Sequence, residues 1–199
     1  MENTKLKAAL KYRNLGFSVI PVGKDKTPFF QWAKYQTRKA SLDEIKQWWA
    51  KWPEANVAIV TGQISGMTVI DADSKKGLEA LKEYLPDDLI TPVSKTPKGW
   101  HYFFKYTPAL SNSVRVIEDC DLRNNGGYVV APPSINNNGS YSWIQERNSD
   151  TTPAHIPGLL LDILKNNPYS NREEKTINRN ANKSPHLPTS DNIDFKEGY

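Results

Sequence analysis

Val69-Ile70-Asp71-Ala72-Asp73 joins an apolar run to two carboxylates, and the other predicted elements surround this segment. Met67–Ile70 predicts a strand that leads directly into the two acids. Because side chains on a strand alternate with period two, Asp71 and Asp73 are expected on the same face. Two carboxylates held close together repel unless a cation lies between them, and Mg²⁺ or Mn²⁺ prefers such oxygen ligands. The other interpretation is that these acids cap a helix that begins near Ser74.

Strand and helix patterns on both sides of this segment predict an α+β fold. Helices are predicted over Thr4–Leu15, Ser41–Lys51, Lys75–Leu85 and Ile156–Asn166. Strands are predicted over Phe17–Val22, Asn56–Thr61, Met67–Ile70, His101–Tyr106, Gly127–Ala131 and Tyr141–Ile144. These elements form one predicted domain over residues 1–166, and the polar stretch 167–199 has the composition of a disordered linker or tail.

Composition limits the class of protein. The 199 residues carry a formal net charge of +4, a mild basic excess compatible with a polyanionic partner. Cys120 is the single cysteine, which excludes an intrachain disulfide framework and a zinc site of several thiolates. No run approaches the roughly 18 apolar residues of a membrane span, and Met1–Leu15 has no signal-peptide core. We therefore expect a reduced, cytoplasmic protein without membrane association.

The segment Thr96–Phe104 combines a glycine loop with cationic and donor side chains. A loop that contains Gly99 and leads into a strand is expected to expose backbone N–H groups. Lys98 and His101 add positive or donor groups beside it, and this combination suits a triphosphate. In the other interpretation, His101 satisfies its hydrogen bonds at the edge of an aromatic hairpin.

The segment Asp119–Ser134 supplies a third acid, Asp121, followed by Arg123 and a Gly126-Gly127 turn. It suits a third metal ligand beside a phosphate-binding cation. Read alone, Asn-Gly-Gly is equally an ordinary hairpin turn and Asp121 an ordinary loop acid.

The early loop Lys24–Trp32 interleaves cations with aromatic rings. Lys24 and Lys26 are suited to contact a nucleic-acid backbone while the rings stack on bases. Such a segment is equally often a solvated loop that lies over a core.

Taken together, three acids, a Gly-x-His loop and an arginine form a chemical set, each part at the end of a predicted strand. Two-metal catalysis needs carboxylates for both ions and a donor for the departing pyrophosphate. At these residues the sequence resembles the bifunctional DNA primase/polymerase family of the archaeo-eukaryotic primase superfamily, over about residues 8–146. The Gly-x-His loop falls where the family has Ser-x-His, and Asp121–Ser134 is the most specific match.

The resemblance implies a primase-polymerase fold with an RRM-like catalytic sheet and a second small α/β layer. It implies that Asp71, Asp73 and Asp121 hold two Mg²⁺ or Mn²⁺ ions and that His101 contacts the triphosphate. His101 is expected to be directed at the phosphates and away from the carboxylates, with help from Lys98 and Arg123. Gly99 stands where the family often has Ser, so Lys98 or the backbone is expected to supply that phosphate contact.

The activity implied is template-directed nucleotidyl transfer from dNTPs or NTPs on single-stranded or primed DNA. Members of the family occur in plasmid, phage and integrated-element replication, which implies a helicase partner in cis or in trans. Two other classes stay open. One is a catalytically silent module of the same fold that binds single-stranded DNA or a nucleotide. The other is a different metal enzyme, a nuclease or a nucleotide-sugar transferase, that uses the Asp-x-Asp pair.

Overall fold

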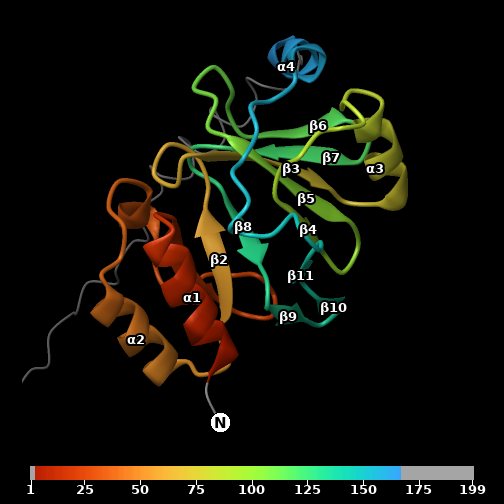
Figure 1. Ribbon diagram of the computed structural model, residues 1–199. Coiled ribbons are helices and arrows are strands. Elements are labelled where there is room, and N and C mark those ends of the chain that lie inside the picture. The colour runs from red at the N-terminus through yellow and green to blue at the C-terminus, as the bar shows by residue number, and fades with distance from the viewer. Residues whose placement is uncertain (1–2, 167–199) are drawn as a thin grey trace, which may run out of the picture.

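Two antiparallel sheets, together with a two-stranded hairpin over residues 135–140, organise residues 3–166, the part of the chain that the computed structural model describes (Figure 1). The strands are β1 (Ser18–Val22), β2 (Asn56–Val60), β3 (Met67–Ala72), β4 (Val93–Lys95), β5 (Trp100–Lys105), β6 (Ser113–Ile117), β7 (Cys120–Arg123), β8 (Tyr128–Ala131), β9 (Ile135–Asn136), β10 (Gly139–Ser140) and β11 (Ser142–Trp143). The helices are α1 (Thr4–Asn14), α2 (Leu42–Lys51), α3 (Lys75–Lys82) and α4 (Gly158–Lys165), with a 3-10 helix at Ala33–Gln36. The predicted tail at 167–199 lies outside the described residues.

The smaller sheet has the strand order β1-β2-β8 and carries α1 and α2. Every residue of β1 and β2 is buried, and such continuous apolar runs are typical of strands covered on both faces. The helices pack their apolar residues Ala9, Tyr12, Ile45 and Trp49 into the same core. The prediction of α1, α2 and these two strands is confirmed.

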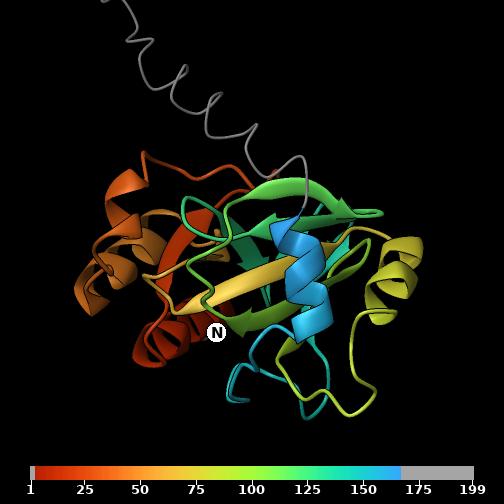
Figure 2. The ribbon, with the colours of Figure 1, turned by 90° about the horizontal axis from the view of Figure 1, so that it is seen from above.

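The larger sheet has the strand order β11-β4-β5-β3-β7-β6. Side chains of β3 alternate between two cores: Met67 and Val69 enter the core of the smaller sheet, while Ile70 and Ala72 enter a second core. The second core is covered by α3 and α4, which lie at the larger sheet (Figures 1 and 2). Asp71 continues the face of Met67 and Val69, so it lies on the side of the larger sheet that faces the smaller one.

The chain crosses between the sheets three times, after β2, after β7 and, through β9 and β10, after β8. The first two of these crossovers pack together. Thr61 donates its backbone N–H to the Gly127 carbonyl at 2.9 Å and its hydroxyl to the Asn124 carbonyl at 2.6 Å. Gly62 has a positive φ of 88°, and a Cβ there would overlap Asn125. The interpretation of Asn125-Gly126-Gly127 as a hairpin turn is therefore wrong, because β7 and β8 belong to different sheets.

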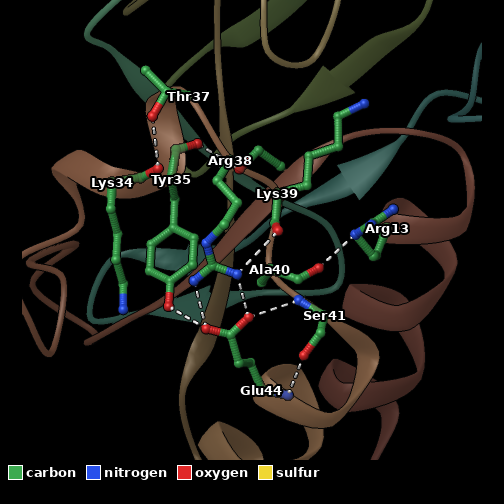
Figure 3. A network of polar contacts seen from close by, with 10 residues as sticks. Arg13, Lys34, Tyr35, Thr37, Arg38, Lys39, Ala40, Ser41 and Glu44 are labelled. Atoms are coloured by element: carbon green, nitrogen blue, oxygen red, sulfur yellow. Dashed lines mark hydrogen bonds and ion pairs between the residues drawn. The ribbon is translucent and has the colours of Figure 1, made fainter.

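The 3-10 helix and the start of α2 are joined by a polar network around Glu44 (Figure 3). The hydroxyl of Ser41 accepts from the Glu44 N–H while the Glu44 carboxylate accepts from the Ser41 N–H, which is the predicted capping box. The same carboxylate accepts two bonds from the Arg38 guanidinium at 2.7 Å and one from the Tyr35 hydroxyl at 3.0 Å. A single side chain thus fixes the segment that enters α2.

Other boundaries differ from those predicted. The helix predicted to reach Leu85 ends at Lys82, and the last helix begins at Gly158 with Pro157 as its N-cap, not in its first turn. The strands β4, β6 and β7 were not predicted. None of the described helices is long and apolar enough to cross a membrane.

Candidate active site

The acids and the histidine of the site lie side by side on three neighbouring strands. In the register of the larger sheet, Asp71 on β3 stands opposite His101 on β5 and opposite Asp121 on β7. Residues directly opposite each other in antiparallel strands share a face and have Cβ atoms about 4.5–5.5 Å apart. Each lies one residue inside the end of its strand, as expected for Asp71 and His101, whereas Asp121 lies on a strand that was not predicted.

Asp71 and His101 are in contact. Nε2 of His101 lies 3.3 Å from Oδ1 of Asp71, and both side chains are largely buried. Burial alone would raise the pKa of Asp71, but the nearby His101, with Arg123 and Lys26, holds the pKa of this carboxyl below its usual value. The expected orientation of His101 away from the carboxylates is therefore wrong.

Asp73 follows the end of β3 and has the opposite electrostatic situation. Its backbone N–H donates to the Asp119 carbonyl at 2.8 Å, which fixes the segment between β3 and α3. Partial burial raises the pKa of Asp73, and repulsion from Asp71 and Asp121 raises it further. The three acids are therefore close enough to disfavour simultaneous ionisation.

Asp121 is held by two arginine residues. Its Oδ2 accepts from the Arg123 guanidinium at 2.8 Å, and its Oδ1 accepts from the Arg115 backbone N–H at 3.0 Å. Arg115 lies in an irregular part of β6 and has a positive φ of 52°. Such irregularities in a strand redirect backbone groups away from the ladder, and here one N–H serves a carboxylate.

Two adjoining cavities open at these strands. The larger, about 380 Å³, is also bordered by Asn112, Arg123 and residues 126–130 at the crossover to β8. The smaller, about 120 Å³, is also bordered by Asp73, the Thr96–Lys98 loop and the turn between β9 and β10. The residues common to both are Lys26, Asp71, His101 and Tyr141. Asp121 borders neither cavity.

The sequence matches the family model of bifunctional DNA primase/polymerase, N-terminal, over residues 9–159. The chain belongs to this family. The match includes both sheets and every residue of the candidate site. A comparison with curated proteins finds no match.

The glycine loop of this primase/polymerase domain differs from the expectation in its backbone groups. The N–H groups of Lys98 and Gly99 both donate to the Thr96 hydroxyl, at 3.3 and 2.9 Å. The expected free backbone donors for a triphosphate are therefore occupied at these two positions. A Cβ at position 99 would overlap the Ala72 carbonyl of β3, so glycine is required here where the family often has Ser.

Two buried polar atoms of the primase/polymerase domain have no hydrogen-bond partner within residues 3–166: Oγ of Ser94 and Nδ1 of His101. The two residues stand opposite each other on β4 and β5. Buried polar atoms nearly always have a hydrogen-bond partner. Two unpaired atoms on directly opposite residues, one of them His101, are therefore an unusual feature of the site.

Sequence reasoning gave no role in the site to two residues that line both cavities, Tyr141 and Lys26. Tyr141 is buried with its ring 6.1 Å from that of His101, and burial, with Asp71 nearby, raises its pKa to about 12. The predicted strand Tyr141–Ile144 contained this residue without assigning it a role. Lys26 was assigned to nucleic acid, yet it borders both cavities.

The donor set fits a hard divalent cation. Asp71, Asp73 and Asp121 offer carboxylate oxygens, the ligands that Mg²⁺ and Mn²⁺ prefer, and their mutual repulsion would be relieved by a cation. Within residues 3–166, no three or more His, Cys, Asp or Glu side chains are grouped so that they could hold a metal ion, so the fit is one of ligand chemistry. Asp121 would bind through the lone pairs that Arg115 and Arg123 leave free.

Proposed function

We propose that this domain catalyses template-directed nucleotidyl transfer from dNTPs or NTPs to a DNA primer or a first nucleotide. The observation that supports this best is the register of the larger sheet, which puts Asp71 between His101 and Asp121 beside two adjoining cavities. Membership of the primase/polymerase family supports the same reaction class. In the reaction the attacking hydroxyl bonds to the α-phosphorus, and pyrophosphate leaves with the electron pair of the broken P–O bond.

Asp71, Asp73 and Asp121 would hold two Mg²⁺ or Mn²⁺ ions. When bound, such ions lower the pKa of the attacking hydroxyl and neutralise charge on the phosphate oxygens. His101 and Lys98 would donate to the triphosphate, since both border the smaller cavity beside Asp73. Arg123 would orient Asp121 and present its remaining N–H groups to the larger cavity.

We further propose that residues 1–166 act as the catalytic domain. The six-stranded sheet corresponds to the RRM-like catalytic sheet of the family, and the three-stranded sheet with α1 and α2 corresponds to the second small α/β layer. Residues 128–130 support this division, because they lie on β8 of the smaller sheet and border the larger cavity.

The test is incorporation of labelled nucleotides on primed and unprimed single-stranded DNA, with dNTPs or NTPs and with Mg²⁺ or Mn²⁺. We expect metal-dependent extension by the wild type and none by Asp71→Ala. Asp43→Ala, which removes an exposed carboxylate from α2, should extend like the wild type. Template-dependent release of pyrophosphate would exclude a nuclease and a nucleotide-sugar transferase. Binding of DNA or nucleotide without incorporation would instead identify a silent module.

A further inference from the structure

The loop that follows β1 is closed by its own backbone. Val22 and Pro28 form an isolated bridge, and the Gly23 N–H donates to the Thr27 carbonyl at 2.8 Å. The Lys26 N–H donates to the Gly23 carbonyl at 3.0 Å, while Oδ1 of Asp25 accepts from the Thr27 N–H at 3.0 Å. The loop is therefore a turn closed by hydrogen bonds, and residues 24–27 at its tip are exposed to solvent.

Lys26 is held in this turn in an unfavourable backbone conformation. Its φ is 72°, in the left-handed region that residues with a Cβ seldom adopt. The hydroxyl of Tyr128, on β8, donates to the Lys26 carbonyl at 3.1 Å and ties the turn to a wall of the larger cavity. Strain of this kind is kept where the surrounding structure over-determines it, which occurs most often at functional sites.

The Lys26 side chain serves the site electrostatically. Lys26 borders both cavities, and its charge contributes to lowering the pKa of Asp71 and opposes the rise at Asp73. No hydrogen bond or ion pair of its ammonium group is formed within residues 3–166, whereas the nearby Arg123 is bonded to Asp121. Lys24, two residues earlier, borders neither cavity.

We propose that Lys26 is a binding residue for the nucleotide triphosphate. This inference rests on the proposed function and deepens it. A triphosphate that extends from one cavity into the other meets the residues common to both, of which Lys26, His101 and Tyr141 carry hydrogen-bond donors and Lys26 carries the ammonium group. A DNA backbone offers one charge per phosphate, whereas a triphosphate concentrates several within reach of a single ammonium group. The position of Lys26 between the two cavities therefore favours the polyphosphate over the template strand.

The experiment is calorimetric titration of the full chain with dGTP, dGDP and dGMP in the presence of Mn²⁺. Lys26→Ala should weaken dGTP binding about ten- to a hundredfold, the range of one charge-assisted hydrogen bond. The affinity of Lys26→Ala for dGMP should change far less. The ratio of its dGTP affinity to its dGMP affinity should therefore be smaller than that of the wild type. Lys26→Arg should retain most of the affinity. Lys24→Ala, in the same loop, should bind all three nucleotides like the wild type.

Two further readouts separate the possible failures. A thermal melt shows whether Lys26→Ala remains folded, and fluorescence anisotropy measures its binding to a labelled primer–template. Unchanged dGTP affinity with weaker DNA binding would overturn the inference and show that Lys26 contacts the DNA instead. If the wild type binds dGTP and Lys26→Ala binds it equally, only this inference fails. If the wild type binds no triphosphate, the proposed function fails together with it.

Discussion

Asp71 and Asp73 are two positions apart, yet the fold shifts their pKa values in opposite directions. His101, Arg123 and Lys26 outweigh burial at Asp71, so its folded pKa lies below the usual value. At Asp73, partial burial and repulsion from Asp71 and Asp121 outweigh the attraction of Lys26 and His101, so its folded pKa lies above the usual value. A group whose folded pKa is raised stabilises the fold at low pH, and this stabilisation is lost as the pH rises through the folded pKa. A group whose folded pKa is lowered stabilises the fold above its unfolded pKa, which is about 3.9 for Asp.

Asp73→Asn should therefore stabilise the metal-free protein at pH 7, because it removes a carboxylate that the fold disfavours. The rise in Tm should be at most about 2–4 °C, since Asp73 is exposed and its charge is screened by water. The gain should disappear below about pH 4, where Asp73 is protonated in both states. Asp71→Asn should lower the Tm at pH 7. Melting curves of both variants across pH decide this, with the exposed Asp87→Asn as the control.

Ser94 gives a second test at the scale of one atom. Its hydroxyl is buried without a partner within the described residues, and an unsatisfied buried polar group costs about 1–3 kcal/mol. Ser94→Ala should leave the free energy of unfolding unchanged or raise it. Ser18→Ala is the matched control, because Ser18 is equally buried on β1 but donates to the Tyr35 carbonyl at 2.7 Å. Denaturant titration should show a loss for Ser18→Ala only, and an equal loss for both would mean that the Ser94 hydroxyl is bonded.

At the scale of elements, α2 owes its defined start to Glu44. The Arg38 guanidinium outweighs partial burial and holds the pKa of this carboxyl well below its usual range. Its contribution is thus present above the unfolded pKa of about 4.3 and is lost as the pH falls through the folded one. The network in Figure 3 therefore weakens in acid.

Glu44→Gln should cost about 1–2 kcal/mol at pH 7, because glutamine keeps the capping geometry but loses the ion pair. The difference from the wild type should shrink below about pH 4. Asp43→Asn, in the same first turn but exposed, should cost less at every pH. A constant difference between Glu44→Gln and wild type from pH 7 to pH 3 would show that the charge contributes nothing.

Strands with a strong apolar pattern could be predicted from the sequence. Strands that form only because neighbouring strands pair with them could not. The runs that form β1, β2, β3 and β5 are apolar enough to indicate strands by themselves. Cys120-Asp121-Leu122-Arg123 has only two apolar residues, and it becomes β7 because β3 and β6 pair with it on both sides. The three acids were recognised from their neighbours in sequence. Their juxtaposition depends on a register between segments about 50 residues apart, which no local pattern encodes.

Side-chain direction was the least predictable part of the site. His101 was singled out from its sequence context, yet its contact with Asp71 depends on the cross-strand pair that β3 and β5 form. Lys26 reaches the cavities because its turn takes a left-handed conformation, for which lysine has no preference. Both features arise from tertiary constraints that override local preference.

At the scale of the whole molecule, the two sheets meet at a pair of crossovers that must fit closely. Gly62→Ala adds a methyl group that overlaps Asn125, in a backbone conformation with φ 88°. Gly66, at the other end of the same turn, has φ 68° and nothing within 4 Å of an added Cβ. Alanine variants of these two glycines therefore distinguish the cost of backbone strain, present at both positions, from the cost of crowding, present only at Gly62.

Gly66→Ala should cost about 1–2 kcal/mol, the usual penalty of a left-handed residue with a Cβ. Gly62→Ala should cost about 1–3 kcal/mol more, because overpacking adds to the strain. Urea unfolding of the two variants measures the difference. A similar loss in the free energy of unfolding for both variants would mean that the crossovers can move apart to accommodate the methyl group at no cost in stability.

The two-residue turn between β6 and β7 limits where sequence length can vary. The carbonyl of Asp119 accepts the Asp73 N–H, and its carboxylate accepts the Ser74 hydroxyl at 2.8 Å. A single inserted residue there would displace the acid pair and shift the frame of β7, turning Asp121 to the opposite face. An insertion between the exposed Asp87 and Asp88 meets no such constraint. Natural length variation and engineered fusions should therefore accumulate between α3 and β4, and the β6–β7 turn should keep its length.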